Sequence, residues 1–200
     1  MTTTAGSAPL PTGGVDLIYP DADGVVEGRL HTESDAKGLV VLAYPTAYSR
    51  FGRNDERLCA LAHEHGYSTV SVDLLTPEET TVRTGELPAR LRRRLAAVLE
   101  DGHRRGRARL FVFAIGEAAP AAIPAADGHD VGAIATCALP GVVHARETDV
   151  ELTGSAVLEC TPTLDAPLTW DDVDRAMLRA LVWFDAARSN PRRATGSSRV

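Results

Sequence analysis

Residues Gly38-Leu-Val-Val-Leu-Ala-Tyr44 (GLVVLAY) are the clearest indication of the fold class. A continuous apolar run of this length is typical of a parallel strand that is covered on both faces by other elements. Similar runs recur at Thr69–Leu75, Ala108–Ile115, Gly132–Leu139 and Ser155–Cys160. Two shorter, alternating segments come first, and the turn-forming residues between them predict an antiparallel hairpin; they are Val15–Tyr19 and Val25–His31.

Helical periodicity occupies three of the intervals between these runs. Apolar residues recur at helical spacing over Asn54–His65, Leu87–His103 and Trp170–Arg188. Thr169 precedes two aspartates and is a good N-cap residue for the last of these helices. Alternating strands and helices predict an α/β protein, a three-layer α/β/α sandwich with a mostly parallel sheet and an N-terminal antiparallel hairpin.

Composition predicts one globular domain. Of the 200 residues, 44% are hydrophobic and 24% are charged, so the chain has enough apolar side chains for a core. We expect the domain at 15–188, with disordered tails at 1–14 and 189–200 that are polar and lack periodicity. The N-terminus lacks an apolar signal segment, and three cysteines do not form a disulfide framework. These features predict a cytoplasmic protein.

Charge and hydropathy exclude two classes of partner. No apolar run is long enough to span a membrane, and a net charge of −6 argues against general nucleic-acid binding. Arginines do gather locally, but without interleaved aromatic residues, so a solvated helix face is the favoured interpretation. These arginines stand at positions 90, 92, 93, 94, 104, 105, 107 and 109.

The segment from Gly38 to Glu79 resembles the α/β-hydrolase superfamily, and most closely its dienelactone-hydrolase-like branch. The resemblance is carried by the GLVVLAY strand, by Ser49-Arg50 and Arg53-Asn54 at the start of a helix, and by the run Val72-Asp73-Leu74-Leu75-Thr76-Pro77-Glu78-Glu79. It extends more weakly to Arg188. It implies a sheet with ligands at the carboxyl ends of its strands, and a carboxylic-ester or lactone hydrolase.

The catalytic positions of that family are altered in this chain. The family places its nucleophile in a Gly-x-Ser-x-Gly turn after the fifth strand. The matching residues are Ala114-Ile115-Gly116-Glu117-Ala118, so Gly116 takes the nucleophile position and has no side chain that could attack a substrate. Pro120 fits a first helical turn, whereas Pro124 is expected to break the helix that follows.

The other catalytic groups are altered as well. The family's His-Gly, which shapes the oxyanion hole, is replaced by Tyr44-Pro45, and proline has no N–H to donate. Asp165 matches the triad acid as a possible remnant. No histidine follows residue 144, so the family's catalytic base has no counterpart. The family's additional strand before the closing helix is missing too, since the chain passes from Asp165 to that helix within a few residues. We therefore predict a degenerate member, truncated at the C-terminal side of its sheet, that lacks both the nucleophile and the catalytic histidine.

A ligand could still bind in the remnant cleft. The candidate ligand-binding residues are Tyr44, Thr46, Tyr48, Arg50 and Glu117, where the two tyrosines either form a ligand rim or fill the volume of a lost active site. Glu117 is either a possible acid/base or a charge that stabilises a helix start.

The remaining reactive residue types give no motif. Cys59, Cys137 and Cys160 are interpreted as packing residues. His63 and His65 are interpreted as solvated, since a spacing of two puts them on different helix faces. No metal motif and no phosphate-binding glycine loop occurs, so we expect no cofactor.

Three hypotheses follow. The first is a catalytically inactive protein that binds a small molecule or a protein partner. The second is a dienelactone-hydrolase-like enzyme that uses unconventional residues such as Glu117, Asp165 and Tyr48. The third is a structural module, in which an exposed sheet edge or the last helix packs against another subunit, for example in a homodimer.

Overall fold

A single mixed sheet organises the chain in the computed structural model, which describes residues 14–22, 24–46, 49–81, 85–105, 109–137, 156–160 and 169–189. Seven strands form the sheet in the order β1-β2-β4-β3-β5-β6-β7. Their bounds are β1 Val15–Asp21, β2 Gly24–His31, β3 Leu39–Tyr44, β4 Ser68–Asp73, β5 Leu110–Ile115, β6 Val131–Cys137 and β7 Ala156–Cys160.

Strand directions agree with the sequence-based prediction. β3 pairs in parallel with both β4 and β5, and the parallel pairing continues through β6 to β7. β1 and β2 form the antiparallel hairpin, and β2 joins it to the sheet by an antiparallel pairing with β4. The carboxyl ends of the five parallel strands therefore share one edge, which is where ligands bind in such sheets.

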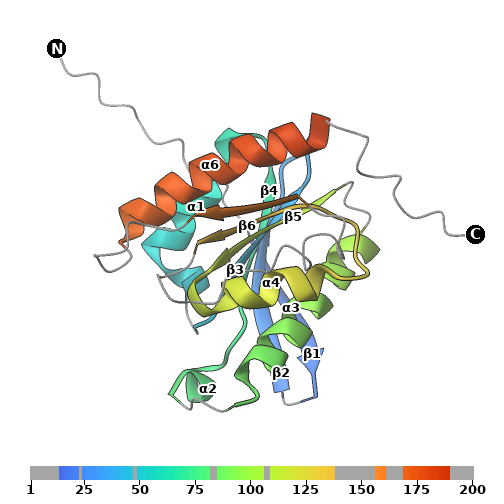
Figure 1. Ribbon diagram of the computed structural model, residues 1–200, viewed down its shortest axis with the longest axis vertical. Coiled ribbons are helices and arrows are strands. Elements are labelled where there is room, and N and C mark those ends of the chain that lie inside the picture. The colour runs from blue at the N-terminus through green and yellow to red at the C-terminus, as the bar shows by residue number, and fades with distance from the viewer. Residues whose placement is uncertain are drawn as a thin grey trace, which may run out of the picture.

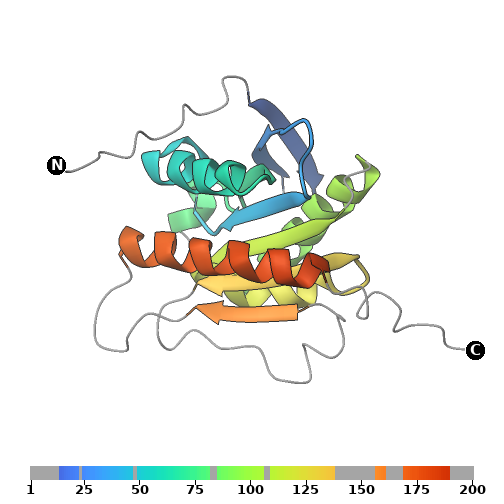
Figure 2. The ribbon, with the colours of Figure 1, turned by 90° about the horizontal axis from the view of Figure 1, so that it is seen from above.

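Helices cover both faces of the sheet, as Figure 1 and Figure 2 show. α1 (Arg53–Glu64) and α6 (Trp170–Ser189) pack together on one face, and α3 (Leu87–Arg104) packs with α4 (Ala119–Ala126) on the other. Two short 3₁₀ turns precede α1 and α4, namely η1 (Ser49–Phe51) and η2 (Gly116–Ala118). The three-layer α/β/α architecture is confirmed.

Each face of the sheet has its own hydrophobic core. Val41 and Val112 face the core beneath α3 and α4, whereas Leu42 and Phe113 face the core beneath α1 and α6. All six residues of β3, and likewise all six of β5, are buried. This two-sided burial explains why these strands are apolar at consecutive positions and do not alternate.

The structure refines the predicted elements at particular positions. β4 ends at Asp73, two residues earlier than predicted, and the short helix α2 (Pro77–Thr81) was not predicted. The expected break at Pro124 is wrong, because α4 continues through it and ends at Ala126. Pro124 lacks the N–H that would bond to the carbonyl of Pro120, so it removes one backbone hydrogen bond near the start of α4 and leaves the residues after it free to stay helical.

Thr169 caps α6 as predicted. Its hydroxyl accepts from the Asp172 N–H at 3.3 Å, and its own N–H donates to the Asp172 carboxylate at 3.0 Å. This reciprocal pattern is a capping box. The tails predicted at 1–14 and 189–200 lie outside the described residues except for Gly14, which precedes β1, and Ser189, which ends α6.

Candidate functional site

The turn after β5 keeps a left-handed backbone at the position that the resemblance aligns with a nucleophile. Gly116 has a φ of +59°, a conformation that residues with a side chain adopt at an energetic cost. A Cβ atom placed there would lie 3.6 Å from Cγ of Pro45, at the end of β3. Pro45 therefore lies directly beside the space in which a nucleophile side chain would begin.

The other candidate residues of the remnant cleft have different outcomes. Glu117 is half-buried in η2, next to Gly116. Thr46 is exposed, and its hydroxyl lies 2.7 Å from that of Ser49. Tyr48 and Asp165 lie outside the described residues, so their predicted roles stay predictions.

Tyr44 requires a correction, since it lies in the core and not at a ligand rim. Only 2% of its surface is exposed, and its hydroxyl donates to Oδ1 of Asp55 at 2.9 Å. The alternating direction of side chains along β3 points Tyr44 toward α1, into the core that α1 and α6 cover. The alternative interpretation, that Tyr44 fills interior volume, fits this position.

Asp55 is the centre of a buried polar group beneath α1. Its Oδ1 also accepts from the Ser71 hydroxyl at 2.5 Å, and the Cys59 thiol lies 3.9 Å away. Burial raises the pKa of Asp55 to about 6 and the pKa of Cys59 to about 12. A thiol with so high a pKa stays protonated near neutral pH, which agrees with the packing role predicted for Cys59.

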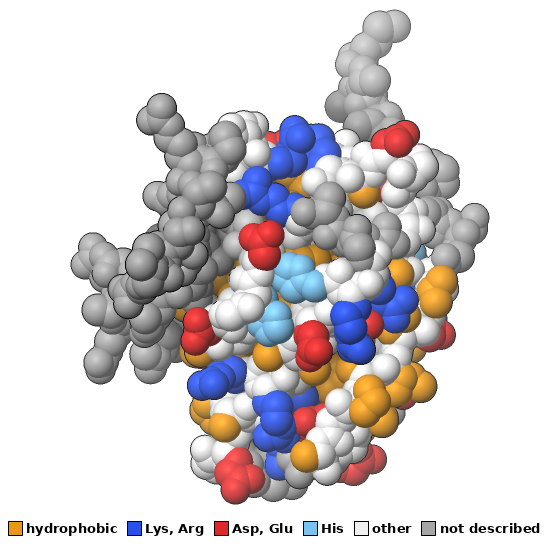
Figure 3. Space-filling view, turned by 90° about the vertical axis from the view of Figure 1, so that its right-hand side faces the viewer, with side chains coloured by type: hydrophobic (Ala, Val, Ile, Leu, Met, Phe, Trp, Pro, Cys, Tyr) orange, Lys and Arg blue, Asp and Glu red, His pale blue; other side chains and the backbone are white. Residues whose placement is uncertain are grey.

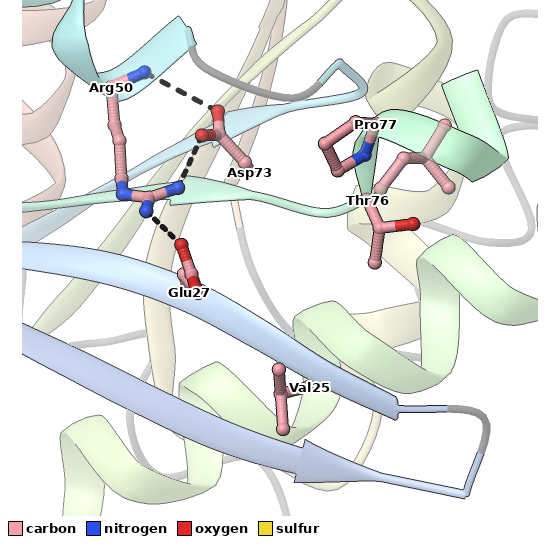
Figure 4. A pocket seen from close by; sticks show the side chains of 7 residues that line it. Val25, Glu27, Arg50, Asp73, Thr76 and Pro77 are labelled. Carbon is pink, nitrogen blue, oxygen red and sulfur yellow. Dashed lines mark hydrogen bonds and ion pairs between the residues drawn. The ribbon is translucent and has the colours of Figure 1, made fainter. Parts of the chain in front are cut away.

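A pocket of about 180 Å³ opens at the carboxyl end of β4 (Figure 4), and we call it the β4 pocket. Its charged residues come from three elements: Glu27 from β2, Arg50 from η1 and Asp73 from the end of β4. The other lining residues are Val25, Leu75, Thr76 and Pro77. Of the predicted ligand-binding residues that the structure describes, Arg50 is the one that lines this pocket.

Arg50 joins the two carboxylates of the β4 pocket. Its guanidinium donates to Oδ2 of Asp73 at 2.6 Å and to Oε2 of Glu27. Asp73 also accepts from the backbone N–H of Ser49 at 3.0 Å and from that of Arg50 at 3.4 Å, which holds η1 against β4. Burial raises the pKa of Asp73 although the charge of Arg50 opposes this shift.

The predicted solvated arginine face is wrong for Arg94, whose side chain is fully buried in α3. Arg94 donates to Asp21 at 2.8 Å, to Glu79 at 2.5 Å and to the carbonyl of Leu74 at 2.8 Å. Figure 3 shows a face on which basic side chains are interspersed with acidic and apolar ones. The arginines of α3 therefore include an internal anchor, and the described part of that face presents no continuous basic surface.

The solvated interpretation is also wrong for His63. Its side chain is only 8% exposed, and its Nε2 lies 3.2 Å from the Thr69 hydroxyl, because α1 packs this turn onto β4. Cys137 is buried, as predicted. The packing role of Cys160 stays a prediction, because its side chain is not among those that the structure describes. Among the described residues, no three His, Cys, Asp or Glu side chains are grouped so as to hold a metal ion.

Sequence reasoning missed Glu27 and Asp73 as pocket residues. A signal for Asp73 was present, because it is an acidic residue at the end of a buried apolar strand, where a charge needs a partner. Glu27 lies at an exposed position of an alternating strand, so its sequence context resembles that of any surface glutamate.

Known structures share this fold at low sequence identity. A dienelactone hydrolase from Anabaena variabilis matches with a TM-score of 0.58 and 16% identity, over 86% of this chain and 97% of that protein. Est1E from Butyrivibrio proteoclasticus matches with a TM-score of 0.59 and 8% identity, over 87% and 100%. An α/β serine hydrolase homologue from Coxiella burnetii matches with a TM-score of 0.55 and 12% identity, over 82% and 96%.

These similarities establish that the chain has the α/β-hydrolase fold. No protein-family model and no curated protein matches its sequence. Among the helices that the structure describes, none combines the length and the apolar composition that crossing a bilayer requires.

Proposed function

We propose that this protein is a non-catalytic member of the α/β-hydrolase fold that binds a small molecule at the carboxyl edge of its sheet, in the β4 pocket. The observation that carries the proposal is Gly116: the turn keeps its left-handed φ of +59°, but the residue has no side chain. An acyl transfer of the family's kind needs a nucleophile and an adjacent base.

Two further features support binding without turnover. Pro45 has no N–H to offer a developing oxyanion, and no histidine follows residue 144 to serve as the base of the family's triad. The β4 pocket is a concave site with a few convergent polar groups, which is the usual character of a small-molecule site.

Covalent labelling and hydrolysis assays test the proposal. The full chain is incubated with a fluorophosphonate probe and with p-nitrophenyl acetate and butyrate, beside a dienelactone hydrolase as the positive control. We expect no labelling and no hydrolysis above those of a heat-unfolded sample. The Gly116→Ser variant should stay inactive as well, because its hydroxyl has no base to activate it.

Labelling or saturable hydrolysis by the original chain would overturn the proposal in favour of an enzyme with unconventional residues. Glu117→Gln, Asp165→Asn and Tyr48→Phe would then locate the catalytic groups, since each removes one candidate function at nearly constant size. The homodimer hypothesis stays a prediction. β7 ends the described sheet, and analytical ultracentrifugation of the full chain measures whether the chain associates.

A further inference from the structure

We propose that the β4 pocket selects small organic cations, and that Glu27 binds the ammonium group of an alkylammonium ligand while the Arg50–Asp73 pair stays in place. This inference rests on the proposed function, because it names the ligand class of the same pocket. It depends on the charge balance, the hydrogen-bond capacity and the shape of the pocket.

The charged residues that line the β4 pocket leave one negative charge in excess. One guanidinium, that of Arg50, faces the two carboxylates of Glu27 and Asp73. The nearest charges on the same face of the hairpin, Asp16 and Arg29, form an ion pair at 3.0 Å and cancel each other. A cation in this pocket therefore gains electrostatic energy, whereas an anion meets net repulsion.

Glu27 is the carboxylate with capacity to bind a ligand. Asp73 is 3% exposed, and its oxygens already accept from two backbone N–H groups and from Arg50. The Glu27 side chain is 53% exposed, and it accepts from Arg50 through Oε2. An ionised carboxylate offers about four acceptor sites, so Glu27 can bind an ammonium group and keep its bond to Arg50.

The position of Arg50 favours an organic cation over a metal ion. Its guanidinium lies between the two carboxylates, as Figure 4 shows, and occupies the place where a metal ion would need to be to bind both. Hard cations such as Mg²⁺ and Ca²⁺ require several oxygen ligands arranged around them. An ammonium group requires only one carboxylate at hydrogen-bond distance.

The uncharged walls suit a short alkyl chain. Val25 and Pro77 lie to the right of the charged residues in Figure 4, and Leu75 lines the pocket with them. The cavity of about 180 Å³ is smaller than the range of about 300–1,000 Å³ that is typical of drug-sized ligands. The pocket thus fits a ligand of a few carbon atoms with one cationic end.

NMR titration of the full-length, ¹⁵N-labelled chain tests the inference. The probes are n-butylammonium chloride, n-butanol and sodium butyrate, which share an alkyl chain and differ in charge. We expect saturable amide shifts at Val25, Glu27 and Thr76 with n-butylammonium, and binding at least about tenfold weaker for n-butanol and butyrate. Magnesium chloride should produce no saturable shifts at these residues.

Charge-removing variants separate the pocket from general attraction to an acidic protein. Glu27→Gln should weaken n-butylammonium binding about tenfold, because it keeps the size of the side chain and removes its charge. The matched control is Glu64→Gln, an exposed residue of α1 that does not line the pocket, and it should leave the affinity unchanged. The thermal midpoint of each variant shows that both remain folded.

Several results would overturn the inference. They are equal binding of n-butanol, preferential binding of butyrate, unchanged affinity in Glu27→Gln, or shifts that map away from the β4 pocket. Failure here is distinguishable from failure of the proposed function. Esterase activity would refute the non-catalytic role without affecting charge selectivity, whereas binding of n-butanol or butyrate would retain a small-molecule site and refute its cation preference.

Discussion

Two buried arginines lie at the carboxyl end of β4, and they differ in what their surroundings leave for a ligand. Arg94 approaches from α3 and donates to Asp21, Glu79 and the Leu74 carbonyl. Arg50 approaches from η1 on the other side and binds Asp73 and Glu27. The first arginine is enclosed by protein, whereas the second lines an open pocket.

Charge balance distinguishes the two groups. Around Arg94, the carboxylates of Asp21 and Glu79 are also bound by Arg93 and Arg90 at 2.7 and 2.8 Å, and Arg90 pairs with Glu86 as well, so the positive and negative charges balance. Around Arg50 the carboxylates are in excess, and Glu27 is half exposed. Ion pairs between arginine and acidic side chains therefore anchor the hairpin and α2 around Arg94. Around Arg50, the same kind of ion pair leaves one negative charge without a partner of opposite sign.

The Arg94 group also supports the β4 pocket. Glu79 accepts from the Thr76 N–H at 2.9 Å while it binds Arg94, so the loop that carries Thr76 and Pro77 is fixed to α3. The pocket wall is thus held by an ion pair on the far side of the loop.

Replacing Arg94 should have the largest effect on stability. Arg94→Met leaves Asp21 and Glu79 with fewer donors in a buried position, and we expect the free energy of unfolding to fall by about 3–5 kcal/mol in urea titrations. The matched control, Arg93→Met, removes a half-exposed partner of the same Asp21 and should cost about 1 kcal/mol or less. Equal losses for the two variants would contradict the anchoring role of Arg94.

Asp55 is a buried carboxylate that accepts hydrogen bonds from hydroxyl groups and not from an arginine, and its pKa differs accordingly. Its pKa of about 6 lies above the ordinary 3.8, so the folded state binds more protons than the unfolded state between those values. Stability from this group is therefore full below about pH 4 and is lost as pH rises through 6. A shift of this size corresponds to about 3 kcal/mol.

The Asp55→Asn variant measures this contribution directly. Its stability relative to the original chain should improve by about 2–3 kcal/mol between pH 4 and pH 7 in urea titrations. Asp172→Asn is the control: hydrogen bonds from Thr169 lower the pKa of Asp172 to about 2, so its pH dependence lies below pH 4. If the difference in unfolding free energy between Asp55→Asn and the original chain does not change with pH, the pKa of Asp55 is not raised in the folded state.

Replacing Arg50 should cost less than replacing Arg94. In Arg50→Met, Asp73 keeps two backbone N–H donors and Glu27 can turn to solvent, so we expect a loss of about 2 kcal/mol at pH 7. The loss should shrink as the pH falls, because burial raises the pKa of Asp73 and protonation removes the unpaired charge. If Arg50→Met lowers the free energy of unfolding as much as Arg94→Met does, then Arg50 is a structural anchor like Arg94 and the distinction between the two residues is wrong. The comparison is made by urea unfolding, with the exposed Arg175→Met as the surface-pair control.

The fold was predictable to a large extent from local patterns. Apolar runs such as Leu39–Tyr44 and Leu110–Ile115 identify themselves because burial on both faces requires consecutive apolar side chains. The Thr169 cap was also predictable from a local pattern, because its hydrogen-bond partner, Asp172, lies only three residues away. The prediction of a break at Pro124 was wrong, because a proline removes a single backbone hydrogen bond toward the helix start and does not prevent the following residues from being helical.

The candidate site was predictable only in part. Sequence placed Gly116 at a turn, and the structure shows it there with a left-handed backbone. Arg50 lines a pocket, and its role in ligand binding stays a prediction. Tyr44 was misplaced as a rim residue, because one residue of register decides whether a side chain at a strand end faces the core or a cleft.

Local sequence patterns were enough to predict the layers, the strand directions and a residue without a side chain at position 116. Which charged side chains contact each other depends on the tertiary structure. Arg94 binds Asp21, which is 73 positions away in the sequence, and Lys37 binds Asp185, which is 148 positions away. No local sequence pattern predicts partners so far apart. Hydrophobic periodicity is read over one element, whereas the pairing of charges depends on how separate elements are brought together. The same limit holds for Arg50, whose pocket exists because η1, β2 and β4 converge at one edge of the sheet.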